Sequence, residues 1–516
     1  MPSPPDKNPD SNLDQKKTPA VKKNRRSSWS GPWLSSNEAL KNVVLKMRLQ
    51  SLSNSSSTTP PSESEPESDP FNSRPISRGN AAPDYASLLS DKLLLKILSK
   101  ISDKKQHISN SLVCKRWCML SGKLINSIKL LDWEFLESGR LSFRFPNLID
   151  VNIVPSCIKS ERNSGILLSN KSCSLFLDSG VGENEGFLVK KGDVLGSDVV
   201  DRGVRILAEG CGNLRKVVLM NVSEEGLSIL ADECELLQEM ELLCCGDSSL
   251  KGIFKCQNLQ MLKLVAHLDG IYDSVVSDIG MTILAQGCRR LLRLELVGCE
   301  GSYDGIKAIG HCCQMLEELV LSDHRMDGGW LSALSYCGNL KTLRIQSCKS
   351  IDSNPGPDEH LGYCPTLEEL HVQQCQMREK LGVRALFLVC QTVREIVFED
   401  CWGLDNSIFN AASICRSVRY LSLEGCSLLT MEGLESVILF WRKLDRLRVV
   451  ACNNIKDGEI TPELATLFSV LKELKWRPDS RSLVEAGLAG TGVGQKDEAR
   501  LKTCPGRCSY FHSNYL

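Results

Sequence analysis

The chain has 516 residues, and its 62 Lys and Arg residues nearly balance its 63 Asp and Glu residues, which leaves a net charge of −1. The charged residues are mixed along the chain and form no basic face, so we expect no nucleic acid as a partner. No apolar run approaches the length that spans a bilayer, and we expect no membrane partner.

The first 83 residues are rich in Ser, Pro, Lys and Asn, and residues 51–70 carry little apolar sequence. Such a segment cannot bury enough surface to order itself, so residues 1–83 are predicted to be disordered. Two interpretations of its basic residues carry equal weight, a nuclear import signal and a solvated tail. The clusters are formed by Lys16, Lys17, Lys22, Lys23, Arg25 and Arg26. Residues 37–52 fit a short amphipathic helix.

The pattern of apolar residues over 84–131 predicts a small helical domain. Ser90 is expected to cap its first helix, whose apolar stripe consists of Leu93, Leu94, Ile97, Leu98 and Ile101. A second helix is expected to carry Ile108, Leu112, Val113, Trp117 and Leu120. A domain of this size can hardly bury so many apolar side chains by itself, which indicates a permanent partner.

A repeating pattern of cysteines runs through residues 132–480. Nine repeats start with cysteine, at positions 211, 234, 256, 288, 313, 337, 364, 390 and 415. Seven more cysteines stand eleven residues after a start, at positions 245, 299, 348, 375, 401, 426 and 452. Apolar residues follow each start at +3, +6 and +8, as Leu291, Leu294 and Leu296 do after Cys288.

The offsets read Leu-x-x-Leu-x-Leu-x-x-Cys, which is the leucine-rich-repeat pattern with Cys in place of Asn. Three further starts carry an aromatic residue instead, at Phe145, Trp441 and Phe468, which gives about twelve repeats. The +6 and +8 side chains should face the core and the +5, +7 and +9 side chains should face outward. Because many repeats have a glycine eight residues before the next start, followed by apolar residues at helical spacing, the second half should be helical. We expect an α/β solenoid with concave strands and convex helices.

The cysteines themselves predict structure rather than chemistry. A free thiol is small, apolar and often buried, and it can donate weakly to a carbonyl of the neighbouring repeat. Zinc sites need paired ligand spacings, and the nearest match is a lone pair, Cys504 and Cys508, in the tail of residues 481–516 that we expect to be flexible. The polar N-terminus shows no signal peptide, so we expect reduced thiols rather than disulfides. Hence we expect no metal and no cofactor.

The helical domain resembles an F-box. The similarity lies in Leu89, Leu93, Ile97 and Leu98, followed by the run 112–117, Leu-Val-Cys-Lys-Arg-Trp. The chain departs from the family pattern at Ser90, where Pro is usual, and at Lys92, where Glu is usual. An F-box followed by cysteine-containing leucine-rich repeats is similar to plant F-box/leucine-rich-repeat proteins, over about four hundred residues.

The resemblance implies a non-catalytic substrate receptor of an SCF-type ubiquitin ligase, in the nucleus or cytoplasm. Its F-box would bind the Skp-family adaptor and, through it, cullin. Its expected adaptor contacts are Leu89, Leu93, Ile97, Leu98, Leu112, Val113 and Trp117. The target would bind outward strand positions, where large basic and aromatic residues often dominate interfaces. These candidates are Arg344, His371, Tyr420, Arg446 and Arg448.

Two alternatives remain open at this point. One is a hormone receptor of the F-box/leucine-rich-repeat type, in which a small molecule holds the target in place. The other is a leucine-rich-repeat scaffold outside any ligase, which the departures at Ser90 and Lys92 keep possible. An enzyme has little support, because the chain carries no P-loop, Gly-x-Ser-x-Gly, kinase or dinucleotide motif.

Overall fold

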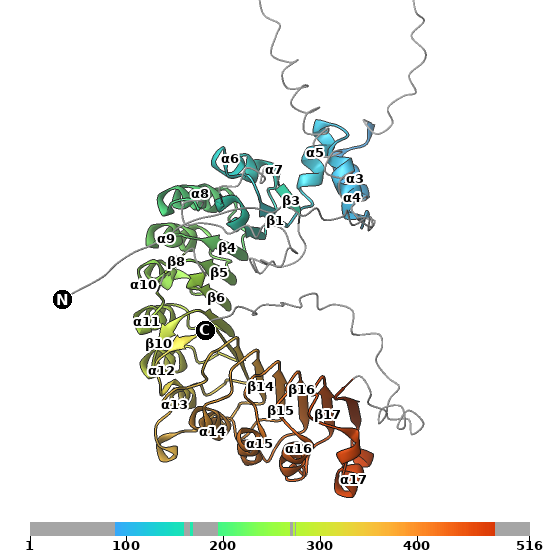
Figure 1. Cartoon of the computed structure of the whole chain (residues 1–516). Coiled ribbons are helices and arrows are strands. Elements are labelled where there is room, and N and C mark those ends of the chain that lie inside the picture. Colours follow the sequence, from blue (N-terminus) through green and yellow to red (C-terminus); the bar gives the residue numbers. More distant parts are fainter. Residues whose placement is uncertain (1–87, 159–165, 169–193, 269–271, 274, 480–516) are drawn as a thin grey trace, which may run out of the picture. The chain divides into compact units, whose positions relative to one another are not determined.

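The computed structural model of the chain describes residues 88–158, 166–168, 194–268, 272–273 and 275–479 (Figure 1). The basic clusters of residues 16–26, the amphipathic segment 37–52 and the tail 481–516 lie outside the described residues. Among the helices within these ranges, none has the length and apolar content needed to cross a membrane.

Within the described ranges one sheet of fourteen strands forms, and neighbouring strands are parallel except at one edge. At that edge β1 (Ser127–Leu130) pairs in parallel with β2 (Asp150–Asn152) and antiparallel with β3 (Ile166–Leu168). The remaining strands follow in chain order: β4 (Lys216–Met220), β5 (Glu239–Leu243), β6 (Met261–Val265), β9 (Arg293–Val297), β11 (Glu318–Ser322), β13 (Thr342–Gln346), β14 (Glu369–Gln373), β15 (Glu395–Glu399), β16 (Tyr420–Glu424), β17 (Arg446–Val450) and β18 (Glu473–Arg477).

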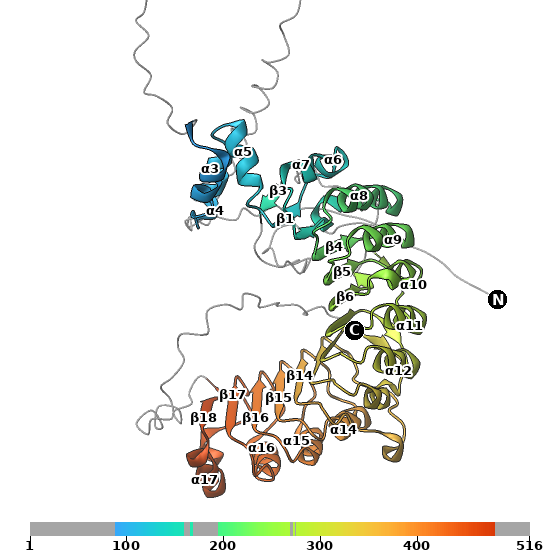
Figure 2. The same ribbon diagram turned by 180° about the vertical axis from the view of Figure 1, so that it is seen from behind.

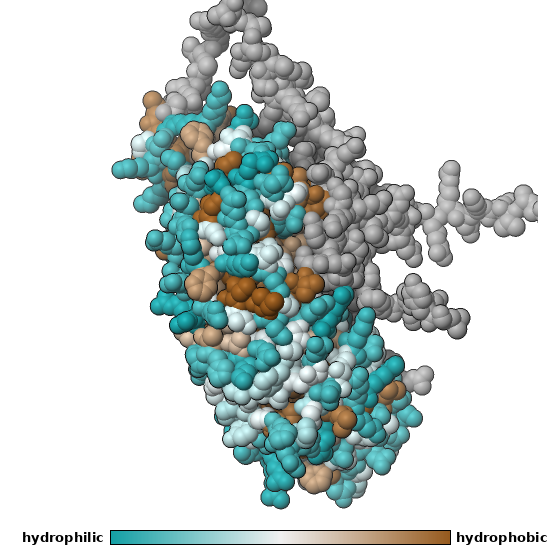
Figure 3. Space-filling view, turned by 90° about the vertical axis from the view of Figure 1, so that its left-hand side faces the viewer, coloured by the Kyte–Doolittle hydropathy of each residue, from teal (hydrophilic) through white to brown (hydrophobic). Residues whose placement is uncertain are grey.

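Helices connect these strands and cover one face of the sheet, while none of the described helices lies on the opposite face (Figure 2). They are α6 (Trp133–Glu137), α7 (Arg140–Arg144), α8 (Ser197–Gly210), α9 (Glu224–Glu233), α10 (Asp247–Leu250), α11 (Asp278–Gly287), α12 (Tyr303–Cys312), α13 (Trp330–Ala333), α14 (Lys380–Val389), α15 (Asn406–Phe409), α16 (Met431–Ile438) and α17 (Pro462–Val470). The helix-covered face is largely hydrophilic, with apolar side chains in small groups (Figure 3).

Short 3₁₀ turns and strand pairs complete the connections. The turns are η1 (Val154–Cys157), η3 (Lys251–Lys255), η4 (Leu334–Tyr336), η5 (Asp358–His360), η6 (Asn410–Ile414) and η7 (Asp457–Glu459). The small pairs are β7 (His267–Leu268) with β8 (Tyr272–Asp273), and β10 (Glu300–Gly301) with β12 (Arg325–Met326). Stacked strand–turn–helix units of this kind form a leucine-rich-repeat solenoid.

The twelve repeats expected from the sequence are confirmed. Each predicted start is followed five residues later by a strand, as Cys288 is by β9 and Phe468 by β18. The inward side chains form one continuous core, in which Leu291, Leu294 and Leu296 are fully buried. β1 is an additional strand that the pattern did not predict, so the sheet begins at Ser127, inside the range expected to be helical.

The sixteen cysteines of the repeat pattern lie in this core as free thiols. Cys313 Sγ donates to the Cys288 carbonyl at 3.5 Å, and Cys401 Sγ donates to the Val372 carbonyl at 3.3 Å. Both acceptors belong to the preceding repeat, which confirms the expected thiol contact. Burial raises the pKa of the Cys234 thiol to about 12 and also raises that of Cys288 well above its ordinary value, so these thiols stay protonated.

Carboxylates of one repeat cap the helix of the next, an arrangement that the sequence analysis missed. Asp201 accepts the backbone N–H of Ser223 at 3.0 Å and its hydroxyl at 2.5 Å. Asp247 accepts the N–H of Ser277 at 2.9 Å and that of Gly280 at 3.0 Å. A Cβ at Gly280 would overlap the Asp247 carboxylate, which explains the glycine that recurs early in the helices.

One repeat lacks the expected helix. Between β13 and β14 the structure has only the short turn η5, although the general pattern predicted a helical second half for each repeat. Pro355 and Pro357 lie in this connection, and neither has a backbone N–H for a helical hydrogen bond. The prediction is therefore wrong for this repeat.

The segment ahead of the sheet is helical, with α3 (Asp91–Leu98), α4 (Lys104–Ser111) and α5 (Lys115–Gly122). Ser90 caps α3 as expected, because its Oγ accepts the Leu93 N–H at 3.4 Å. The single second helix predicted from the sequence is wrong. The helix ends with α4, and a separate helix α5 follows. Cys114 caps α5, because its Sγ accepts the Trp117 N–H at 3.4 Å.

Candidate functional site

Two surfaces carry the residues that the sequence singled out, and the first is on the helical segment. Leu94, Leu98 and Leu120 form its small core, with at most 2% of each residue exposed. Helix α5 packs on both α3 and α4. The three helices are tied to the next segment where the Asn147 amide donates to the Lys123 carbonyl at 2.7 Å. So small a core leaves many apolar side chains of the segment uncovered.

Five of the uncovered side chains, besides Leu88 at the start of the segment, form what we call the apolar face. They are Leu93, Ile97, Ile108, Leu112 and Val113, with exposed fractions of 54%, 51%, 50%, 44% and 61%. Leu93 and Ile97 stand four residues apart and therefore share one side of α3. Leu112 and Val113 lie in the link between α4 and α5. A group of this size, left in water on a short segment, is typical of a binding surface.

Four of the seven expected adaptor contacts lie on this apolar face: Leu93, Ile97, Leu112 and Val113. The others are placed differently. Leu98 is fully buried in the segment's own core, and Trp117 is half-buried against that core. Leu89 is half-buried, and its carbonyl accepts a hydrogen bond from Arg116. Ile108 joins the face although it was not among the expected contacts.

The second surface is the outward side of the sheet, which we call the strand face. Arg344 and His371 are opposite each other on β13 and β14, and Tyr420 and Arg446 are opposite each other on β16 and β17. All four are partly exposed, as is Arg448. The structure therefore places the five expected target-binding residues on outward strand positions.

Arg446 and Arg448 are held by ion pairs across neighbouring strands. Arg446 reaches past β16 to Glu395 on β15, with 2.6 Å between Nη2 and Oε1, and its guanidinium lies 4.6 Å from the centre of the Tyr420 ring. Arg448 binds Glu424 at 2.6 Å and covers Ser422, whose hydroxyl is 3.1 Å away. Ser422 is only 2% exposed, so an outward position does not guarantee contact with solvent.

An ion-pair network crosses five strands of the same face. Lys263 on β6 binds Glu295 on β9 at 2.8 Å, and Arg293 lies 3.4 Å from the same carboxylate. Arg293 and Arg344 then share Glu318 on β11, at 3.1 and 2.8 Å. Lys263 also lies 3.9 Å from Glu241 on β5. These ion pairs hold the side chains in fixed rotamers, so little side-chain entropy is lost when a partner binds.

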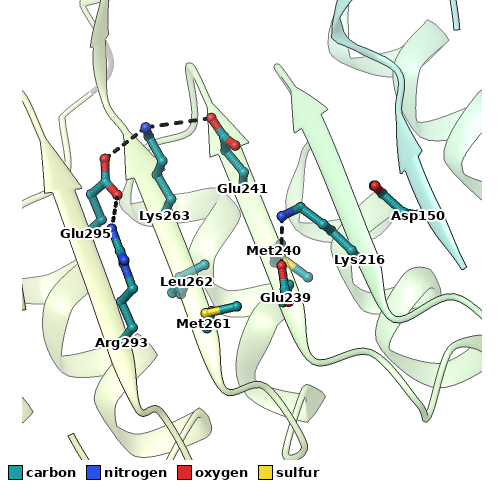
Figure 4. Close-up of a pocket in the computed structure, with 10 residues that line it drawn as sticks. All are labelled: Asp150, Lys216, Glu239, Met240, Glu241, Met261, Leu262, Lys263, Arg293 and Glu295. Atoms are coloured by element: carbon teal, nitrogen blue, oxygen red, sulfur yellow. Dashed lines mark hydrogen bonds and ion pairs between the residues drawn. The ribbon is translucent and has the colours of Figure 1, made fainter. Parts of the chain in front are cut away.

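A pocket of about 550 Å³ opens at one end of this network, above strands β2 to β9 (Figure 4). Its polar lining residues are Asp150, Lys216, Glu239, Glu241, Lys263, Arg293 and Glu295, and its apolar ones are Met240, Met261 and Leu262. Sequence reasoning did not select these residues. The repeat pattern could have pointed to them, because every charged residue that lines the pocket stands at the outward position +5 or +7 after a repeat start.

Burial sets the electrostatics of the strand face. It raises the pKa of the Glu241 carboxyl, with Lys263 acting against the shift, and it also raises the pKa of Asp150. For His371 burial lowers the pKa, and the positive charge of Arg344 lowers it further. His371 also lies 3.3 Å from Glu369. Within the described residues, no three His, Cys, Asp or Glu side chains gather where they could hold a metal ion.

No family model matches the chain. Among solved structures it is similar to an internalin from Listeria monocytogenes, with 17% identity and a TM-score of 0.36, over 67% of this chain and 89% of the internalin. It is also similar to a chain of the mouse RP105/MD-1 complex, with 16% identity and a TM-score of 0.40, over 68% of this chain and 51% of that one.

Proposed function

We propose that this chain is the substrate-recognition subunit of an SCF-type ubiquitin ligase. The helical segment would bind a Skp-family adaptor and, through it, cullin, while the strand face of the solenoid would bind the target protein. The chain itself would perform no chemistry. It would hold the target near the ubiquitin-carrying enzyme and so raise the local concentration of the reacting groups.

The observation that carries this proposal is the apolar face of the helical segment. Leu93, Ile97, Leu112 and Val113 match the positions of the F-box resemblance, and each of the four stays about half exposed. A side chain of this size contributes about 1.5–3 kcal/mol when it is fully buried. About half of each residue is already covered, so an interface would gain about half of this value per residue. Summed over four residues, that gain still favours a stable complex, and the segment's own core is too small to supply the cover.

The strand face supports the second half of the proposal. It carries Arg344, Tyr420, Arg446 and Arg448. Ion pairs hold the three arginines in place before any partner arrives, and the Arg446 guanidinium lies over the Tyr420 ring. Arg and Tyr are the residue types that most often dominate protein interfaces. A preformed surface of this kind favours recognition of a folded or extended protein segment.

Co-purification with a plant Skp-family adaptor tests the proposal. The full chain is expressed with the adaptor, and capture is measured for the unmodified protein and for Ile97→Asp and Val113→Asp. Because both side chains are exposed, the variants should fold normally. A charge placed in the buried interface should reduce capture by at least about tenfold.

A matched control is Val470→Asp, which introduces the same charge at an aliphatic side chain that is 70% exposed on α17. It should leave adaptor capture unchanged. If the unmodified chain is stable alone and never captures adaptor, the chain is a leucine-rich-repeat scaffold outside a ligase and the proposal fails. It also fails if the two interface variants capture adaptor as well as the control does.

A further inference from the structure

The pocket on the strand face has an imbalance of charge partners. Among the lining residues that the structure describes, each of three cations has a carboxylate close by: Lys216 has Glu239 at 2.7 Å, Lys263 has Glu295 at 2.8 Å, and Arg293 has Glu318 at 3.1 Å. The remaining carboxylates are less well matched. Glu241 has its cation only at 3.9 Å, and Asp150 accepts the hydroxyl of Ser127 at 2.7 Å. The described lining residues therefore have acceptor capacity to spare and little spare positive charge.

We propose that this pocket binds an arginine side chain of the target protein, with Glu241 as its principal partner. The inference rests on the proposed role of the strand face and names the kind of target segment that the face recognises. The pocket volume, about 550 Å³, lies within the range that encloses small ligands and single large side chains.

Glu241 is well placed for this role. Its side chain is only 12% exposed and lines the pocket beside Lys263 (Figure 4). Burial raises the pKa of its carboxyl, because its present surroundings stabilise the negative charge less well than water does. A guanidinium entering the pocket would supply the donors that this carboxylate lacks, and such charge-assisted hydrogen bonds are stronger in a partly buried site.

Met261 favours arginine over lysine. It is the first residue of β6, five residues after the repeat start at Cys256, and lies between Glu239 on β5 and Arg293 on β9. Its exposed fraction is 37%. This apolar side chain interrupts a row of charges and offers a surface on which the weakly hydrated guanidinium plane and its methylene stem can pack. The ammonium of lysine is more strongly hydrated and cannot bind a carboxylate through two parallel hydrogen bonds.

The test uses the full chain labelled with ¹³C at its methionine methyl groups, since Met261 lines the pocket. The probe is N-acetyl-arginine amide, and the control compound is N-acetyl-citrulline amide, which is similar in shape and uncharged. The resonance of Met261 is assigned from its disappearance in Met261→Leu. We expect a saturable shift of this resonance with the arginine compound and no saturable shift with the citrulline compound.

Two variants connect the shift to the pocket. Glu241→Gln should weaken binding of the arginine compound about tenfold, because one charge-assisted contact is lost. Asp150→Asn should weaken it as well, and both variants should keep the unfolding midpoint of the unmodified protein. The control is Glu399→Gln on β15, where burial also raises the carboxyl pKa but where no pocket residue lies. That variant should bind as the unmodified protein does.

Equal shifts with both compounds, or unchanged binding in Glu241→Gln, would overturn the proposal. So would an equal loss in Glu399→Gln, because the effect would then come from net charge alone. Adaptor capture is measured on the same preparations. Loss of arginine binding with normal adaptor capture counts against the pocket only, and failure of adaptor capture with normal arginine binding counts against the ligase role only.

Discussion

Asp278, the first residue of α11, caps the helix of the following repeat through Ser302. Its carboxylate accepts the Ser302 backbone N–H at 2.8 Å and the Ser302 hydroxyl at 2.7 Å. The same carboxylate also accepts the Gly305 N–H at 2.9 Å, inside the first turn of α12. One side chain thus satisfies two of the backbone donors that every helix leaves unpaired at its start, and it joins two repeats in doing so.

We predict that Asp278→Ala destabilises the interface between these two repeats by about 1–3 kcal/mol, because donors at the start of α12 lose their partner. Hydrogen exchange of the Ser302 and Gly305 amides should speed up first, since a solenoid opens locally between repeats. Asp304→Ala is the control, because Asp304 is exposed in the first turn of the same helix. Its effect should stay within about 0.5 kcal/mol.

A second prediction concerns the glycine beside this cap. Alanine normally stabilises a helix by about 1 kcal/mol relative to glycine. At Gly305 the added Cβ would overlap Asp278 Oδ1, and the Asp278 carboxylate is held in place by three hydrogen bonds, two of them to Oδ1. Gly305→Ala should therefore lower the free energy of unfolding. Denaturant unfolding measures the effect. If the variant is more stable than the unmodified protein, the Asp278 carboxylate is not the fixed group that the structure indicates.

The repeats could be predicted from the sequence because each one obeys the same local rule. Residues such as Leu294 and Leu296 alternate with outward residues on a strand, and a pattern of period two needs no knowledge of the neighbouring repeats. The cap from Asp278 to Ser302 could not be found in this way. It depends on which residue of one repeat lies beside the helix start of the next, and this follows from the stacking distance and twist.

The same reasoning applies to the candidate site. The outward direction of Arg446 follows from strand alternation, but its contact with Glu395 two strands away depends on a rotamer choice. Ser422 was expected to face outward and does, yet the neighbouring Arg448 covers it. On the helical segment the apolar stripe could be predicted from the sequence. Which of its residues are buried, as Leu98 is, and which are exposed, as Ile97 is, depends on how α5 packs and could not be predicted.

A buried histidine predicts a pH dependence of stability. His324 follows β11 with its ring edge toward Trp330, and burial lowers its pKa to about 4. Its Nδ1 accepts the Met326 N–H at 3.4 Å, which requires the neutral ring. The unfolded chain therefore binds more protons than the folded chain between about pH 6.5 and 4. The contribution of His324 to stability is present above that window and is lost as the pH falls through it.

The measurement is the free energy of unfolding at pH 7 and pH 5 for the unmodified protein and for His324→Gln, which has no titrating group. The decrease between the two pH values should be smaller in the variant, because carboxylates elsewhere titrate equally in both proteins. A decrease of the same size in both would show that the His324 ring is protonated without cost in the folded state.

Thiol reactivity is expected to follow burial. Cys114 is exposed at the start of α5, whereas Cys234 is buried with a pKa raised to about 12. At pH 8 only about one in ten thousand Cys234 side chains would be thiolate, the form that reacts. Site-resolved mass spectrometry after brief treatment with iodoacetamide should find Cys114 modified and Cys234, Cys288 and Cys390 unmodified. The same treatment in denaturant should label all four, and early labelling of Cys288 in the folded protein would contradict its place in the core.

The last prediction concerns Lys92, which places a positive charge in the first turn of α3. The helix dipole is positive at this end and favours acidic residues such as Asp91, whose carboxylate binds Arg116 of α5 at 2.8 Å. Lys92→Glu should therefore stabilise α3 by about 0.3–1 kcal/mol at low ionic strength, and less at high salt. Hydrogen exchange of the α3 amides measures this, and adaptor affinity should rise or stay equal. Lys100→Glu, beyond the C-terminal end of α3, is the control and should not slow exchange. Faster exchange in Lys92→Glu would show that the lysine has a stabilising contact that outweighs its unfavourable position on the helix.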